Sequence, residues 1–172
     1  MFRVLFKRFE KFGLSLHPEK TRRVPFSQPD DPGAGRAGGT KPGTFDFLGF
    51  THYWRKSWKG RWVLARKTAH KCLSRALRRI SQWCRKNRDK PLREQVETLG
   101  RNFQGHFGYY GITGNLDGLV QFREAAIGIW RKWLDRRTGD RGSMPWERLK
   151  RLLDFWYLPE ARVVHSIYAA KP

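Results

Sequence analysis

Three kinds of side chain in this sequence have the chemistry for a metal site or a reacting bond. Asp30 and Asp31 are adjacent carboxylates, but Pro29 and Pro32 flank them in a Gly- and Pro-rich stretch with no third acidic residue close by. A two-metal site needs more convergent carboxylates than this, so a solvated turn is the better interpretation. Five histidines are scattered without a partner at ligand spacing, at positions 17, 52, 70, 106 and 165. We therefore predict no catalytic residue and no metal site.

The two cysteines, Cys72 and Cys84, are predicted to lie on one helix, twelve residues apart. That separation corresponds to about 18 Å of helical rise, so the two thiols cannot form a disulfide with each other. His70 is close to Cys72, but no second pair of ligands follows at the spacing of a zinc site. We expect buried thiols, because two cysteines do not make a secreted disulfide scaffold.

The charge of the chain indicates its partner. Thirty-six Lys and Arg stand against fifteen Asp and Glu in 172 residues, which gives a net charge of +21. Such a chain repels itself unless a polyanion is near, and nucleic acid is the abundant one. An anionic membrane is a weaker alternative, since the cations recur in every segment rather than in one block. No apolar run reaches the roughly 18 residues of a membrane span, and no signal peptide is recognisable, so we expect a cytoplasmic protein.

Hydrophobic periodicity predicts an α+β fold, with a small antiparallel unit followed by a bundle of three to four helices. The first part is expected to begin with a helix over 2–12, ended by Gly13, and two short strands at 14–16 and 21–26. A loop over 27–44 follows. A strand then starts at residue 45, the chain turns at Lys59–Gly60, and a partner strand runs over 62–65. In that continuous strand, Phe45 and Phe47 lie on one side and Phe50 on the other.

Beyond residue 67 the period changes to that of helices. We expect one helix over 68–87 and a second from 92 to about 110. A third should start after a cap at Asn115, and a fourth at Pro145. The last sixteen residues show no pattern that predicts their structure. Gly105 and Gly108 are expected to allow close helix packing, and Tyr109 and Tyr110 to pack rather than to stack on bases.

Four motifs resemble those of one protein family. GLSLHPEKTR (13–22) and FDFLGF (45–50) are similar to the end of the palm in group II intron-encoded reverse transcriptases, or maturases, where a Leu-x-Leu-(Asn/His)-x-x-Lys-Thr turn leads to a Phe-x-Phe-Leu-Gly-Phe hairpin. LGRNFQGHFGYYGITGN (99–115), with WRKWLDRR and PWERL after it, resembles the thumb, or maturase-specific domain, of that family. The matches occur in the family's order and cover nearly the whole chain.

The resemblance implies a C-terminal part of such an enzyme. Residues 1–67 would be a remnant of the palm, 68–142 the thumb, and 143–172 a short helix and tail. The complete protein would carry out RNA-directed DNA synthesis and assist intron splicing. Its Mg²⁺-binding aspartates, two of them in a Tyr-Ala-Asp-Asp hairpin, would precede this chain, so we expect no cofactor and no polymerase activity here. The missing N-terminal polymerase portion is an expected partner.

The resemblance also implies roles for three residues. Lys20 would lie near the phosphates of the incoming nucleotide, where an ammonium can neutralise or protonate a pyrophosphate leaving group. The alternative is a surface lysine that pairs with Glu19 or Asp46. Leu48 and Gly49 would belong to the hairpin that grips the 3′ end of the primer, and the alternative is a glycine bulge in a hairpin.

The basic residues are expected to contact phosphate and ribose of intron RNA or of an RNA-template/DNA-primer duplex, rather than base edges. The set comprises Arg66, Lys67, Lys71, Arg75, Arg78, Arg79, Arg101, Arg131, Lys132, Arg136 and Arg137. The alternative is an autonomous basic RNA-binding or architectural protein with no enzymatic role. Such a protein would retain affinity for RNA by itself, and its binding would weaken steeply with salt.

Overall fold

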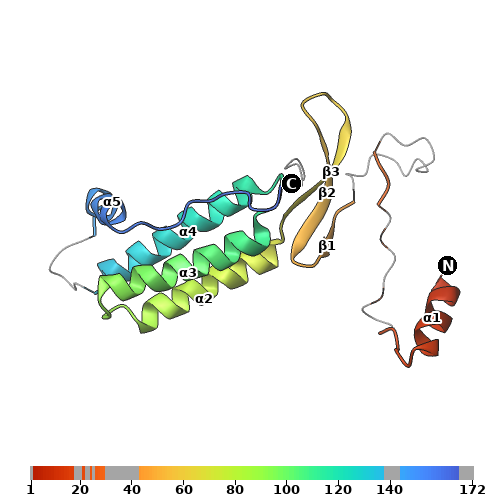
Figure 1. Ribbon diagram of the computed structural model, residues 1–172, viewed down its shortest axis with the longest axis horizontal. Helices are drawn as coiled ribbons and strands as arrows, with labels where there is room; N and C mark the ends of the chain where they lie inside the picture. Colours follow the sequence, from red (N-terminus) through yellow and green to blue (C-terminus); the bar gives the residue numbers. More distant parts are fainter. Residues whose placement is uncertain are drawn as a thin grey trace, which may run out of the picture.

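The computed structural model describes residues 2–17, 21, 24, 26–29, 43–137 and 144–166. This part of the chain contains five helices and one three-stranded antiparallel sheet, which confirms the predicted α+β class (Figure 1). In chain order the elements are α1 (Phe2–Lys11), β1 (Phe45–Phe47), β2 (Phe50–Lys56), β3 (Trp62–Thr68), α2 (His70–Lys86), α3 (Leu92–Tyr110), α4 (Leu116–Asp135) and α5 (Trp146–Phe155). Lys20 and the Asp30–Asp31 pair lie outside the described residues.

The helix α1 ends as predicted at Gly13, which has a φ of 66°. The N–H of Gly13 bonds the carbonyl of Glu10, and the N–H of Leu14 bonds the carbonyl of Phe9. This is the pattern of a glycine-terminated helix. The predicted strand at 14–16 was wrong, because Leu14 is used in the helix end. The described residues of 21–26 are not in a strand either.

The strand predicted from residue 45 is in fact two strands. The chain reverses at Leu48–Gly49, both of which have positive φ, at 48° and 80°. β1 and β2 therefore pair with Phe47 opposite Phe50, in the sheet order β1-β2-β3. Opposed residues of an antiparallel pair share a face, so Phe50 lies on the same face as Phe45 and Phe47. The sequence prediction for Phe50 was wrong, because it did not include the reversal.

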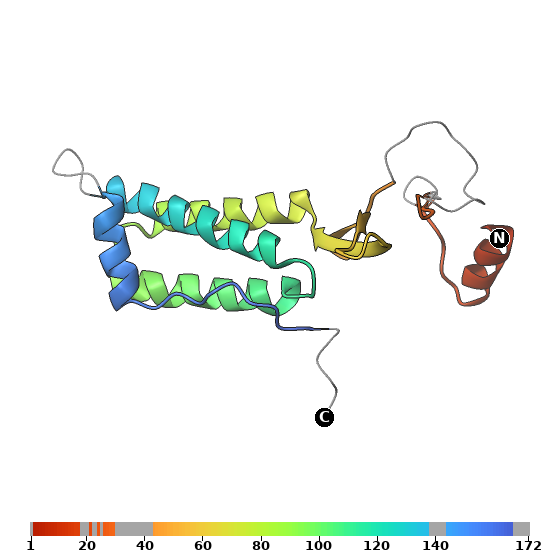
Figure 2. The same cartoon turned by 90° about the horizontal axis from the view of Figure 1, so that it is seen from above.

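The helices α2, α3 and α4 run side by side, with α3 antiparallel to the other two, and α5 crosses the end remote from the sheet (Figures 1 and 2). Their predicted ranges are confirmed. The largest fully buried side chains include Trp130, Phe103, Phe122, Leu99, Leu119, Leu149 and Leu158. Gly105 and Gly108 were wrongly expected at a tight helix contact, because a Cβ at either position would meet no atom within 4 Å.

The segment after α5, whose structure was not predicted, runs back along α3 toward the sheet (Figure 2). The N–H groups of Val164 and His165 both donate to the carbonyl of Gly111, at 2.7 and 2.8 Å. The Nε of Arg123 donates to the carbonyl of Pro159 at 3.0 Å. Leu158 in this segment is 2% exposed. The segment thus covers the core that α3 and α4 leave open.

The sheet is joined to the helices through the side chain of Asn115. Its Oδ1 accepts the N–H of Thr68 at 3.0 Å, and its Nδ2 donates to the Thr68 hydroxyl at 2.9 Å and to the carbonyl of Tyr110 at 2.8 Å. Asn115 precedes α4 as predicted, but its side chain makes no capping bond to that helix. Instead it links the end of β3 to the end of α3. A Cβ at Gly118, in the first turn of α4, would lie 2.6 Å from the Oδ1 of Asn115, so only glycine leaves room there for the Asn115 side chain.

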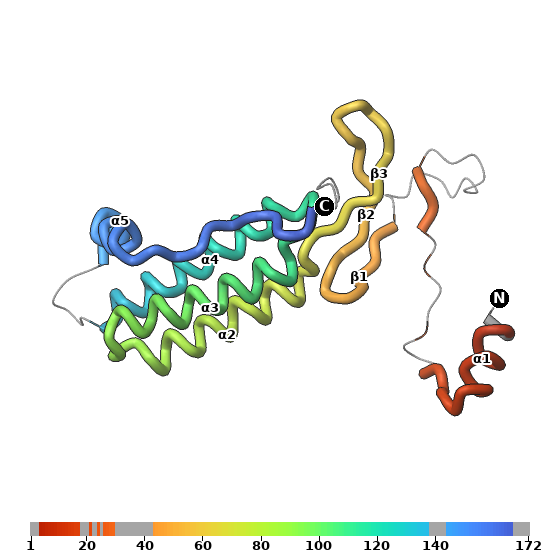
Figure 3. The backbone as a smooth tube through the Cα atoms, viewed as in Figure 1, coloured from red at the N-terminus to blue at the C-terminus, as the bar shows by residue number. Residues whose placement is uncertain are grey.

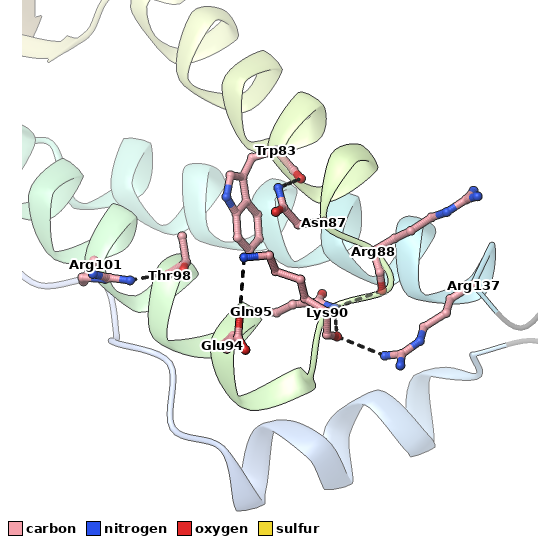
Figure 4. Close-up of polar contacts among 9 residues, drawn as sticks. All are labelled: Trp83, Asn87, Arg88, Lys90, Glu94, Gln95, Thr98, Arg101 and Arg137. Carbon is pink, nitrogen blue, oxygen red and sulfur yellow. Dashed lines mark hydrogen bonds and ion pairs between the residues drawn. The ribbon is translucent and has the colours of Figure 1, made fainter.

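A second buried amide fixes the opposite end of the bundle (Figure 4). The Nε2 of Gln95 donates to the carbonyls of Arg88 and Lys90, at 3.1 and 2.8 Å, and its Oε1 accepts the indole N–H of Trp130 at 2.9 Å. The connection between α2 and α3 is therefore fastened to α4.

Replacing Asn115 by Ala should lower the free energy of unfolding by about 2–3 kcal/mol, because it leaves the buried N–H of Thr68 without its partner and removes one of two bonds to the carbonyl of Tyr110, which still accepts the N–H of Ile112. Asn102→Ala is the matched control, since the Asn102 amide makes one exposed bond to the carbonyl of Thr98. Urea unfolding followed by circular dichroism measures both. Equal losses in the two variants would contradict the role given to Asn115.

Candidate nucleic-acid interface

The cations of this chain are concentrated in a stretch without any acid. From Phe47 to Arg88 there are thirteen Lys and Arg and no Asp or Glu, so the local charge has no internal compensation. The stretch forms β2, β3 and α2, which follow one another without a break (Figure 3). The thirteen are Arg55, Lys56, Lys59, Arg61, Arg66, Lys67, Lys71, Arg75, Arg78, Arg79, Arg85, Lys86 and Arg88.

The outer face of α2 carries six of these cations. All six are exposed, whereas Ile80 and Cys84 on the inner side are buried in the core that α2 shares with α4. The face extends about 22 Å by helical rise. Its members are Lys71, Arg75, Arg78, Arg79, Arg85 and Lys86. We call this set the α2 basic face.

Among the described residues, no member of the α2 basic face forms an ion pair. The ion pairs that occur there follow the end of α2 and join Arg88 to Asp89, Lys90 to Glu94 and Arg93 to Glu97, at 3.6, 3.4 and 3.0 Å. Like charges four residues apart on a helix destabilise it by a few tenths of a kcal/mol. A bound polyanion would remove that repulsion.

A groove of about 450 Å³ separates part of α2 from α3. Arg79 lies on its α2 side and Arg101 on its α3 side, so the structure brings two predicted residues to one groove. The guanidinium of Arg101 bonds the Thr98 hydroxyl at 3.3 Å (Figure 4). Gly105 also lines the groove and leaves the α3 side open there. An anionic backbone can approach this surface closely.

His106 lines the same groove and is 8% exposed. Its ring stacks on Phe122 with a centroid distance of 3.6 Å and an interplanar angle of 10°. Burial lowers the pKa of His106 from 6.5 to about 4, so the imidazole is neutral at neutral pH. Its Nε2 is buried and has no hydrogen-bond partner. The residue therefore offers a flat, uncharged surface and not a cation.

The turn at Leu48–Gly49 rests on the end of α3. The hydroxyl of Tyr109 donates to the carbonyl of Leu48 at 2.8 Å, and Phe50 packs against both Tyr109 and Tyr110. A Cβ at Gly49 would lie 2.9 Å from the hydroxyl oxygen of Tyr110. Glycine is thus needed both for the positive φ and for this close approach. Both tyrosines make the packing contacts that were predicted, and Tyr109 is at the same time 54% exposed.

The predicted cations of α4 lie at the other end of the bundle, and the three arginines among them make contacts within the protein. The Nε of Arg131 donates to the carbonyl of Met144 at 2.8 Å, and its guanidinium lies 4.3 Å from the ring of Trp146. Arg136 lies over Trp133, and Arg137 donates to the carbonyl of Lys90 at 3.3 Å (Figure 4). Lys132 is exposed. These arginines bond or stack within the protein, whereas no member of the α2 basic face forms an ion pair with a described residue.

Arg66 and Lys67 were predicted to lie at the interface. Two groups of cations were missed, one at the far end of the same hairpin and one at the end of α2. They are Arg55, Lys56, Lys59 and Arg61 in the hairpin, and Arg85 and Lys86 in α2. Arg66 is half-buried in β3, and the Lys67 ammonium lies 5.2 Å from the ring of Tyr53. The absence of acids between Phe47 and Arg88 was the signal that could have found all of them.

Both cysteines are free thiols. Cys84 is 1% exposed, and burial raises its pKa to about 12, which confirms an inert buried thiol. Cys72 is half-buried. Within the part of the chain that the structure describes, no three His, Cys, Asp or Glu side chains are grouped so that they could hold a metal ion. No described helix has both the length and the apolar character needed to cross a bilayer.

The fold and this surface define an α+β chain with an uncompensated basic helix beside a basic hairpin. A scan against protein-family models, a search of curated proteins and a search of solved structures each found no match to the chain. The motifs and the geometry are therefore what a functional proposal must rest on.

The buried His106 predicts a loss of stability in acid. The unfolded chain binds a proton near pH 6.5 and the folded chain near 4, so the free energy of unfolding should fall as the pH drops between these values, by up to about 3 kcal/mol. His106→Phe keeps the stacked ring and removes the titration, and should flatten this fall. His70→Phe, at an exposed position, is the control. Urea unfolding at several pH values measures the slopes, and an unchanged slope in His106→Phe would contradict the assignment.

Proposed function

We propose that this chain binds RNA through the α2 basic face and the adjoining hairpin, and that it is related to the C-terminal part of group II intron reverse transcriptases. One observation carries the proposal. Twelve of the thirteen cations lie on the α2 basic face and the hairpin, and none of these twelve pairs with a described carboxylate, whereas the thirteenth, Arg88, pairs with Asp89. Such a surface binds phosphates with high affinity and little sequence preference.

The geometry supports contact with a helical RNA backbone. Exposed guanidinium and ammonium groups repeat along about 22 Å of α2, which suits a row of phosphates rather than a single anion. The groove adds one further cation, Arg101 from α3, on the side opposite Arg79, and Gly105 lets the RNA backbone approach. The cations of α4 are assigned a smaller share, because their arginines are engaged inside the protein.

Two of the family-like motifs meet in space, which favours the relationship. The FDFLGF turn lies on the Tyr109–Tyr110 pair of the second motif, through the bond from Tyr109 to Leu48 and the close approach of Tyr110 to Gly49. In this proposal the complete protein is a cytoplasmic RNA-directed DNA polymerase that assists splicing. The primer-grip role of Leu48 and Gly49 and the nucleotide-proximal role of Lys20 are part of the same proposal. This chain alone is assigned RNA binding and no polymerisation.

The rival is an autonomous basic RNA-binding or architectural protein. The two differ in what they bind best. A relative of maturases should bind group II intron RNA more tightly than a scrambled RNA of equal length, whereas a general RNA-binding protein should bind the two equally. Filter binding with both RNAs at two salt concentrations distinguishes them.

Replacing Arg75, Arg78 and Arg79 together by Gln should weaken RNA binding and lower the slope of log K against log salt by about 2–3, because each phosphate contact contributes about 0.7–0.9. The control replaces three exposed cations of α5, Arg148, Lys150 and Arg151, by Gln, which removes the same charge. Filter binding over a salt series measures both slopes. Equal effects in the two triple variants would mean that net charge, and not the α2 basic face, determines binding.

Gly105→Ala should raise the stability of the fold and at the same time weaken RNA binding. Nothing in the fold requires glycine there, so alanine should raise the free energy of unfolding by about 0.5–1 kcal/mol. The added methyl group lies in the groove and should weaken RNA binding about threefold to tenfold. Gly128→Ala in α4, also without a neighbour within 4 Å, should raise stability and leave binding unchanged. Unchanged affinity in Gly105→Ala would show that RNA does not enter the groove.

A further inference from the structure

The tip of the β2–β3 hairpin carries a tryptophan that the fold does not use. Trp58 is 93% exposed, more than any other large hydrophobic side chain of the described residues. The turn that holds it is well formed. The N–H of Ser57 bonds the carbonyl of Arg61 at 2.7 Å, and the N–H of Gly60 bonds the carbonyl of Ser57 at 2.9 Å, with Gly60 at a φ of 74°. A large apolar ring is thus presented to solvent from a defined turn.

One cation lies over this ring, and others are exposed in the same hairpin. Lys59 places its ammonium 5.5 Å from the centroid of Trp58, and Lys56 lies 5.3 Å from the ring of Trp62 across the hairpin. Arg55 and Arg61 are also exposed near the tip. A ring with an ammonium beside it suits a nucleotide, because the base can stack on the indole and the phosphate can pair with the lysine.

The hairpin projects away from the helices, and its tip is the part most remote from them (Figure 1). β3 has seven residues and leads directly into α2, so Trp58 lies about 20 Å beyond the start of that helix. An RNA helix on the α2 basic face would have its end near the hairpin. Unpaired nucleotides at that end could reach the tip.

We infer that Trp58 is a stacking site for an unpaired nucleobase that adjoins an RNA helix bound on the α2 basic face; this inference rests on the proposed function. The site recognises the junction between paired and unpaired RNA, and not a base sequence, since every base has a face that can stack. Lys59 binds the phosphate of the stacked nucleotide. An anionic membrane fits less well, because Ser57, Lys59 and Gly60 around the single ring offer little apolar area to insert.

The test compares two RNAs with the same duplex, one blunt and one with a three-nucleotide overhang that contains 2-aminopurine. The wild-type chain should bind the overhang RNA about tenfold more tightly and quench its 2-aminopurine fluorescence. Trp58→Ala should lose the preference and the quenching, with unchanged affinity for the blunt duplex. Trp58→Phe should keep most of both. Phe155→Ala, at a 78% exposed aromatic residue of α5, should behave as wild type.

Other outcomes identify what fails. A preference that survives in Trp58→Ala, or an equal loss for both RNAs, overturns the stacking site. Two experiments without RNA can also overturn the stacking site. If Trp58→Ala no longer floats with phosphatidylserine vesicles, the ring contacts a membrane. If Trp58→Ala changes the sedimentation coefficient, the ring belongs to a protein contact. If the α2 triple variant binds as wild type while Trp58→Ala loses the preference, the stacking site stands and the α2 basic face is wrong as the main binding surface.

Discussion

The arrangement of this molecule depends on the buried amide of Asn115. Its side chain bonds the end of β3, the Thr68 hydroxyl and the end of α3, and its own backbone leads into α4. Three elements therefore meet at one group, and every polar atom of its side chain has a partner. An unpaired buried donor or acceptor costs more than one hydrogen bond contributes, so this amide strongly disfavours other angles between sheet and bundle. The directions of the hairpin and of the α2 basic face follow from it.

The charge on α2 is tolerated because the opposite side of the helix is anchored. Each like-charge pair at a spacing of four costs a few tenths of a kcal/mol, whereas each fully buried apolar side chain contributes about 1.5–3 kcal/mol. Ile80 and Cys84 lie in the core with Trp130 and Phe103, and the amide of Gln95 closes that end. Packing therefore outweighs repulsion, and the outer face can remain basic without acids to balance it. A surface kept in this state is suited to a polyanionic partner.

The turn at Leu48–Gly49 connects the sheet to α3 at a second point, close to Asn115. Burial, with a smaller effect from a hydrogen bond to Cys72, raises the pKa of Tyr110 to about 12, so its hydroxyl stays protonated beside the Gly49 backbone. The carbonyl of Gly49 also accepts the N–H of Ala69, just before α2. The sheet is thus held at both the turn and the end of β3. This double attachment holds the base of the hairpin against the end of α3 and the start of α2.

The helices, the fold class and the basic character of the surface can be predicted from the amino-acid sequence alone. Apolar residues at a period of 3.6 specify α2 and α3 to within two residues, and the start of α4 follows the predicted cap at Asn115, because the core face needs little more than that spacing. Hydrophobic alternation did not reveal the reversal at Leu48, since a non-glycine residue with positive φ has no strong local signal, whereas the resemblance of FDFLGF to a hairpin motif implied it. The sequence also could not tell Arg79, which lines an open groove, from Arg131, which bonds the carbonyl of Met144. Two arginines on amphipathic helices look alike in sequence, and only the packing of distant segments decides which of them is left facing solvent.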